Sequence, residues 1–128
     1  MARVLHRGIL QEIVVDDFIP VNEKNQPIFA KASGGNEIWV IILEKCWAKL
    51  HKSYSVISGG LPHEVLHAFS GAPTFYNSMP RTKEDQDALF EVLLDADRKD
   101  SVLCCGTKSD LEIEKKGLVV GHAYTLVV

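Results

Sequence analysis

This sequence lacks the features that mark several classes of protein. Its longest continuous apolar run, residues 38–43, is far too short to cross a bilayer, and the N-terminus has no hydrophobic signal region. Lysine and arginine are spread along the chain and the net charge is −3, which argues against a nucleic-acid partner. We therefore expect a cytoplasmic protein without a membrane span.

Cysteine is also scarce, which argues against a disulfide framework. The three cysteines, Cys46, Cys104 and Cys105, are odd in number and show no Cys-x-x-Cys spacing of the kind that binds metals. Reduced thiols fit this pattern best. Because Cys104 and Cys105 lie in a strand-like segment, residues 101–105, we expect both to be buried.

What is present is the composition of an ordinary globular chain. Its 128 residues are 46% hydrophobic and 24% charged, enough for one modest core that belongs to one domain or to pieces of two. The chain enters a strand-like pattern soon after Met1 and ends at Val128 in the middle of another. We therefore expect a piece of a longer protein.

The first half of the chain predicts a hairpin followed by a helix. Residues 12–15 have the pattern of a strand, and the polar residues 22–26 turn the chain into a second strand at 27–30. A helix is predicted after an N-cap at Asn36, with one broad buried face, because apolar residues recur at three- and four-residue spacing. Asp16 and the adjacent Asp17 point to opposite faces of an extended segment and so predict turn hydrogen bonds rather than an acid–base pair.

The second half predicts short strands around another helix. Residues 74–76 read as a short strand, and Thr82 is the expected N-cap of a packing helix that runs through about Arg98. The strand at 101–105 is expected to pair antiparallel with the one that follows His122.

A five-residue motif suggests zinc. His63-Glu64-Val65-Leu66-His67 matches H-E-x-x-H, in which two histidines one helical turn apart bind zinc and the glutamate polarises a metal-bound water. Pro62 and Gly71 would confine the helix to about two turns. A third ligand is needed, and the only candidates that follow are Glu84, Asp85, Asp87 and Glu91. An exposed amphipathic turn is the preferred interpretation, with a zinc metallopeptidase as the alternative.

One histidine near the C-terminus is the best candidate for acid–base chemistry. His122 follows Gly121 and stands where a strand rich in β-branched and aromatic residues begins. A histidine in that place has a fixed backbone and a partly exposed ring, which is what a general base needs. For an isolated Gly-His pair, capping of a strand end is the simpler interpretation.

The residues around His122 resemble a known family. Residues 115–125, Lys-Lys-Gly-Leu-Val-Val-Gly-His-Ala-Tyr-Thr, are similar to the histidine segment of the calpain-type cysteine peptidases. Residues 14–21 resemble the paired-aspartate strand of that protease core, and residues 36–54 resemble the long helix of its first subdomain. Residues 89–105 are also similar, with Cys104 where the family usually has glycine.

The resemblance implies an α+β fragment of a papain-like protease core. Residues 1–60 would be the C-terminal, helical part of the first protease subdomain, and residues 61–128 the N-terminal part of the second, with antiparallel strands and a helix. Its implied activity is hydrolysis of peptide bonds in protein or peptide substrates, with His122 as the catalytic base. The family is calcium-dependent, and Glu37 matches a carboxylate of the calcium site in its first subdomain.

By the same resemblance, the rest of the catalytic set lies outside this chain. The family's nucleophile stands in a Gly-Asp-Cys-Trp segment before the first residue, and its asparagine in an Asn-Pro-Trp segment after the last. Cys46-Trp47 has the same Cys-Trp pair as the nucleophile segment. A nucleophilic cysteine of this kind sits at a helix N-terminus, however, whereas Cys46 falls well inside the predicted helix. We therefore expect an inactive segment that needs the remainder of the protease core and binds calcium weakly. A non-catalytic calpain-like interaction module is the further alternative.

Overall fold

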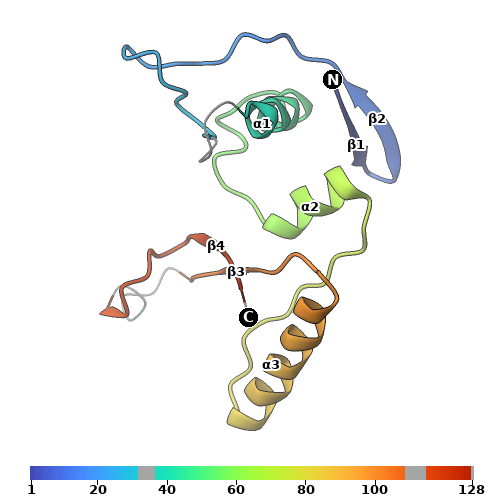
Figure 1. Ribbon diagram of the computed structural model, residues 1–128, viewed down its shortest axis with the longest axis vertical. Helices are drawn as coiled ribbons and strands as arrows, with labels where there is room; N and C mark the ends of the chain where they lie inside the picture. The colour runs from blue at the N-terminus through green and yellow to red at the C-terminus, as the bar shows by residue number, and fades with distance from the viewer. Residues whose placement is uncertain (32–36, 109–114, 128) are drawn as a thin grey trace. The chain divides into compact units, whose positions relative to one another are not determined.

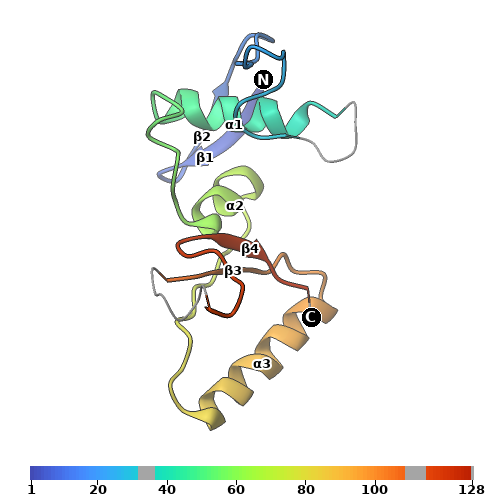
Figure 2. The same ribbon diagram turned by 90° about the vertical axis from the view of Figure 1, so that its left-hand side faces the viewer.

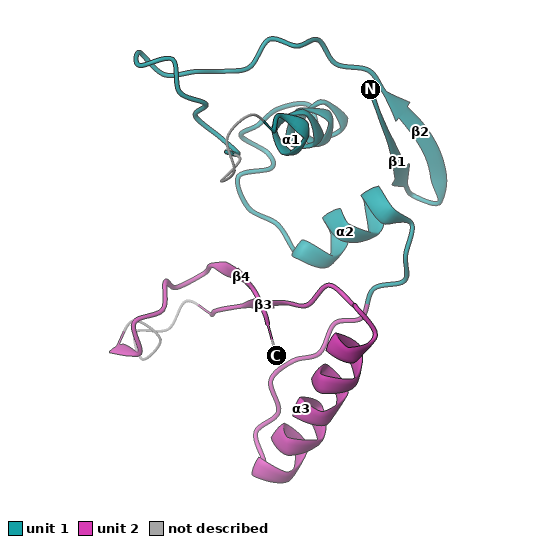
Figure 3. Ribbon diagram, viewed as in Figure 1, with its two compact units in different colours: residues 1–74 teal, residues 75–128 magenta. Residues whose placement is uncertain are grey.

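The computed structural model describes residues 1–31, 37–108 and 115–127 (Figure 1). Within these ranges the chain has an α+β fold of three helices and two small antiparallel sheets. It divides into two compact units, residues 1–74 and 75–128 (Figure 3). The subdomain boundary expected after residue 60 from the resemblance stays a prediction. No helix in the described ranges is long and apolar enough to span a membrane.

The first unit begins with a β-hairpin. Strand β1 (Ala2–His6) pairs antiparallel with β2 (Ile9–Ile13), so that His6 faces Ile9 at the turn. Arg7 and Gly8 form the two-residue loop with φ of 52° and 77°, the left-handed geometry that matches the twist of paired strands. The strand predicted at 12–15 therefore begins and ends earlier than expected.

The hairpin predicted across residues 22–26 is present only as a turn. Asn22 N donates to Gln26 O at 2.9 Å, and one isolated antiparallel bridge joins Val21 to Pro27. The bridge does not extend into a ladder because Pro20 and Pro27 have no backbone N–H to donate.

Two helices cover the hairpin. Helix α1 (Trp39–Leu50) contacts β2, and α2 (Pro62–Ser70) contacts β1; both views show α1 beside the hairpin (Figures 1 and 2). Helix α2 begins at Pro62 and ends before Gly71, whose φ is 69°, as the sequence predicts. The predicted N-cap Asn36 lies outside the described residues, and α1 follows Ile38.

The core of the first unit is small. Its fully or nearly buried residues come from β1, α1 and α2: Val4, Ile41, Cys46, Ala48 and Ala68. The ring centroids of Trp47 and Phe69 lie 5.8 Å apart. Trp39, the first of the apolar residues whose spacing predicted a buried face of this helix, is 59% exposed. It stands in the first turn, where its indole Nε1 donates to Glu37 Oε2 at 3.4 Å.

The second unit holds α3 (Lys83–Arg98) and a two-stranded sheet. Thr82 caps α3 as predicted, since its Oγ1 accepts a hydrogen bond from Asp85 N at 3.2 Å. Strand β3 (Cys104–Gly106) pairs antiparallel with β4 (Ala123–Thr125), which confirms the predicted pairing.

Three expectations for residues 74–128 were wrong. Residues 74–76 are irregular rather than a strand, Cys104 and Cys105 are exposed, and no residue of α3 is buried. The exposure of the two cysteines and of α3 has one cause. A ribbon of two three-residue strands is too small to bury a helix face, and it has too few neighbours for its own side chains to be buried.

Candidate functional site

His122 stands at the entrance to β4, and local backbone geometry places it there. Gly121 has a φ of 61°, a left-handed conformation that costs glycine little, and it turns the chain into the strand. The imidazole is on an exposed residue, with its ring centroid 4.9 Å from that of Tyr124 in an edge-on arrangement at 79°. A ring placed this way is open to a proton donor that approaches from outside.

Thr107 faces His122 across the sheet and contacts its backbone on both sides. Thr107 N donates to His122 O at 2.9 Å, and His122 N donates to Thr107 Oγ1 at 2.9 Å. The same hydroxyl donates to Val119 O at 2.6 Å. The segment that enters β4 is therefore held through one threonine side chain.

Tyr124 adds a second tie to this segment. Its hydroxyl accepts a hydrogen bond from Val119 N at 2.9 Å, while its ring packs against His122. Sequence reasoning missed the roles of Thr107 and Tyr124. The only signal that could have found Thr107 was the register of the two strands, which becomes readable once Gly106 is known to face Ala123.

The thiols do not complete a catalytic pair with His122 in the part of the chain that is described. Cys46 is fully buried in the middle of α1, where its Sγ lies 3.7 Å from Ile13 O, so the prediction that it is a core residue is confirmed. Cys104 and Cys105 are exposed on β3 and face Thr125 and Tyr124. No described hydrogen bond joins a thiol to His122.

Glu37 was expected to contribute to a calcium site. It is exposed, and one carboxylate oxygen accepts the hydrogen bond from Trp39 Nε1. Calcium takes six to eight oxygen ligands, whereas no group of three or more acidic, histidine or cysteine side chains gathers anywhere in residues 1–31, 37–108 and 115–127. The described residues alone therefore do not fit a calcium site.

The H-E-x-x-H motif lies on α2, as predicted. His67 Nδ1 donates to Ala72 O at 2.8 Å, which leaves Nε2 as its remaining ring nitrogen. None of the predicted third ligands joins His63 and His67, since the described ranges contain no cluster of three metal-binding side chains. The geometry does not support a zinc centre there.

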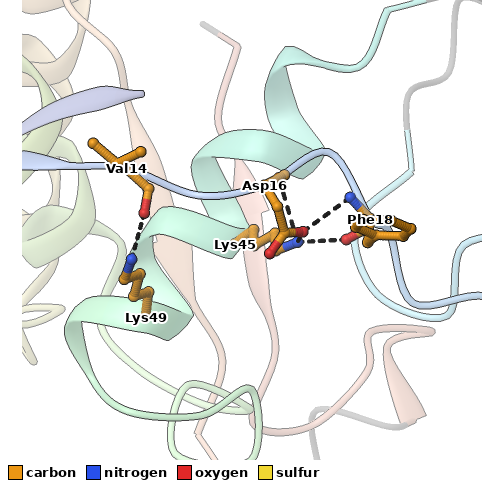
Figure 4. Close-up of polar contacts among 5 residues, drawn as sticks. All are labelled: Val14, Asp16, Phe18, Lys45 and Lys49. Carbon is orange, nitrogen blue, oxygen red and sulfur yellow. Dashed lines mark hydrogen bonds and ion pairs between the residues drawn. The ribbon is translucent and has the colours of Figure 1, made fainter.

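Asp16 takes part in a structural contact rather than in catalysis (Figure 4). Its carboxylate accepts a hydrogen bond from Phe18 N at 2.9 Å and pairs with Lys45 Nζ, which also donates to Asp16 O at 3.3 Å and to Phe18 O at 2.5 Å. Lys49 Nζ donates to Val14 O at 2.5 Å. We call Lys45, Lys49 and their acceptors the lysine clasp; it ties the extended segment 14–18 to α1.

The clasp changes the acidity of its carboxylate. The hydrogen bond from Lys45, followed by the one from Phe18 N, lowers the pKa of Asp16 below its ordinary value of 3.8. This is the behaviour of a structural ion pair, because the charged form is the one that the fold stabilises. The prediction that Asp16 forms turn hydrogen bonds is confirmed.

Comparison with known proteins agrees with this architecture. The family model described as calpain family cysteine protease matches residues 1–128. Calpain-14 of Homo sapiens is 36% identical over 121 residues, and the match covers 94% of this chain. The calpain-type cysteine protease DEK1 of Zea mays is 36% identical over 121 residues, and the calpain-1 catalytic subunit of Rattus norvegicus is 35% identical over 120, each covering 90% of this chain.

The chain belongs to the calpain family of cysteine proteases. It spans 17%, 6% and 16% of the lengths of these three relatives, so it corresponds to one part of each. The class of protein predicted from the residues around His122 is confirmed.

Proposed function

We propose that this chain supplies the general base, His122, of a calpain-type cysteine endopeptidase and does not cleave peptide bonds by itself. The observation that carries the proposal is the place of His122: an exposed imidazole on a hydrogen-bonded strand entrance, in a chain matched along its whole length by the calpain family model. In this chemistry the histidine takes the proton of a thiol, the thiolate attacks the peptide carbonyl, and the histidine returns the proton to the leaving amine.

Inactivity of the separate chain follows from its thiols. A nucleophile must reach the imidazole, yet Cys46 is fully buried in another unit's core, and Cys104 and Cys105 face other residues of β4. We propose that the nucleophilic cysteine and the orienting asparagine belong to other segments of the parent protein. The remainder of the protease core is then the main partner of this chain.

The apolar surface of the second unit supports such a partner. Phe75 and Tyr76 are 86% and 70% exposed, and the apolar residues of α3 have no buried position among them. Exposed apolar side chains of this kind suit an interface with a partner. We propose that the remainder of the protease core packs against α3 and covers these side chains.

Calcium dependence and a cytoplasmic location are further parts of the proposal. Glu37 would provide one carboxylate to a calcium site whose other oxygen ligands come from elsewhere in the core, which predicts very weak binding by the chain alone. Reduced thiols at all three cysteines fit a reducing compartment.

A chimeric protease tests the proposal. This chain replaces the matching segment of the rat calpain-1 catalytic subunit, and calcium-stimulated cleavage of casein is measured. We expect turnover that falls at least about 1,000-fold in His122→Ala, as loss of a triad member does, and that is unchanged in the matched control His67→Ala.

Other results of the chimera experiment would favour one of the two alternative functions. Turnover abolished by His67→Ala but retained in His122→Ala would favour a zinc peptidase. A folded chimera without turnover, beside an active parent, would favour a non-catalytic interaction module. Calcium-stimulated cleavage by the purified 128-residue chain would contradict the proposed inactivity directly.

A further inference from the structure

We propose that Thr107 is the positioning residue of the base: its hydroxyl fixes the backbone of His122 and so sets the place from which the imidazole projects. This inference rests on the proposed function, because it gives His122 a role that needs positioning. The residue itself does not touch the reacting atoms.

The hydrogen bonds around His122 converge on this one residue. Thr107 binds both backbone groups of His122, the carbonyl oxygen through its own N–H and the N–H through its hydroxyl, each at 2.9 Å. The hydroxyl donates its single proton to Val119 O at 2.6 Å, the shorter of its two donor contacts; His122 O lies at 3.2 Å. Thr107 thereby joins the two ends of the turn 119–122.

That turn needs a tie because its backbone is permissive. Gly121 within the turn and Gly117 two residues before it have φ of 61° and 76°, a left-handed region that glycine exchanges readily with other conformations. Among the described hydrogen bonds none reaches the imidazole of His122, and its ring meets Tyr124 only edge-on. By holding the backbone, Thr107 fixes the Cα of His122 and the direction of its Cα–Cβ bond, from which the ring projects through its own two torsions.

The chemistry calls for a hydroxyl and not merely for the shape of threonine. One group must accept from an N–H and donate to a carbonyl at once, which a hydroxyl does and a methyl group cannot. Threonine adds a β-branched side chain that limits rotation about its first torsion. Serine would therefore keep the bridge, whereas the nearly isosteric valine would remove it while leaving the backbone bond from Thr107 N.

The test uses the 128-residue chain and NMR spectroscopy. Amide exchange of His122 and the cross-relaxation between the His122 and Tyr124 rings are measured in wild type, Thr107→Val and Thr107→Ser. Thr125→Val is the matched control, since it makes the same chemical change at an exposed position of β4. We expect about five-fold faster exchange at His122 and a weakened ring contact in T107V, because one hydrogen bond is lost.

T107S is expected to restore both signals, and T125V to leave them unchanged. Equal effects of T107V and T125V, or failure of serine to restore the His122 signals, would overturn the inference. If T107V unfolds the second unit, the test is made on the wild-type chain instead. There the Thr107 hydroxyl proton should exchange slowly with water and show cross-relaxation to the His122 amide. Absence of this cross-relaxation would contradict the bridge.

These readouts involve no turnover, so they separate this inference from the proposed function. Chimera turnover that does not depend on His122 would remove the proposed function. Turnover that depends on His122, together with unchanged His122 exchange in T107V, would remove the role of Thr107 alone.

Discussion

Replacing Lys45 by methionine tests whether the lysine clasp holds the segment 14–18 against α1. Methionine keeps the apolar stem and removes the ammonium group, so the carbonyls of Asp16 and Phe18 lose their shared donor and the exposed Asp16 carboxylate loses its ion pair. The Lys45 side chain is 16% exposed, so water screens these bonds only in part. Each bond contributes about 1 kcal/mol, which predicts a loss of about 2 kcal/mol in the free energy of unfolding.

Two further substitutions, at Lys49 and Lys83, provide smaller stability losses with which the effect of K45M can be compared. Lys49→Met removes one carbonyl contact from a more exposed side chain and should cost about 1 kcal/mol. Lys83→Met removes only a surface pair with Asp87, whose lysine side chain is 80% exposed, and should cost less than about 0.5 kcal/mol.

Urea unfolding followed by tryptophan fluorescence measures the changes at Lys45 and Lys49, while Lys83, in the second unit, serves as a control that should leave this signal unchanged. Both tryptophans, Trp39 and Trp47, lie in α1, so the signal reports on the unit that contains the clasp. K45M should shift the midpoint most, K49M less and K83M hardly at all. A K45M chain no less stable than K83M would show that the clasp contributes nothing to the fold.

Two more predictions concern acid and metals. The pKa of Asp16 is lowered in the folded chain, so its charged form stabilises the fold at neutral pH and this contribution disappears as the pH falls below about 4. The difference in melting temperature between wild type and Asp16→Asn should therefore be largest near pH 7 and vanish in acid; a pH-independent difference would refute the linkage. Calorimetric titration of the chain with calcium should show no site tighter than about 1 mM, and titration with zinc should show no stoichiometric structural site, since no described cluster has three or more ligands. Stoichiometric zinc that is lost in His67→Ala would contradict this.

Local signals explain which parts of the fold could be predicted from the sequence. The limits of α2 follow from Pro62 and Gly71, and the start of α3 follows from Thr82, because each acts on the backbone beside it. The Arg7–Gly8 turn was an equally local signal, a glycine in a left-handed turn, and sequence reasoning overlooked it.

Exposure was harder to predict, because it depends on what packs against a residue and not on the residue itself. Cys104 and Cys105 have the composition of a buried strand, yet within the described residues β3 pairs with β4 alone and both cysteines are exposed. Residues 74–76 have strand-forming side chains, yet the segment is irregular. Likewise, His122 was found from its neighbours in sequence, whereas Thr107 needed the register of β3 and β4.

The most direct test of the central claim is the reactivity of a thiol placed beside His122. In the calpain-1 chimera, the rate of alkylation of the nucleophilic cysteine by iodoacetamide is measured against pH, with and without His122→Ala. If His122 is the base of the pair, the thiol should react fully near pH 6–7 in the chimera, and its reactivity should rise only above about pH 8 in the variant, as for a free thiol. Identical pH profiles in the two proteins would contradict the assignment of His122 as the general base.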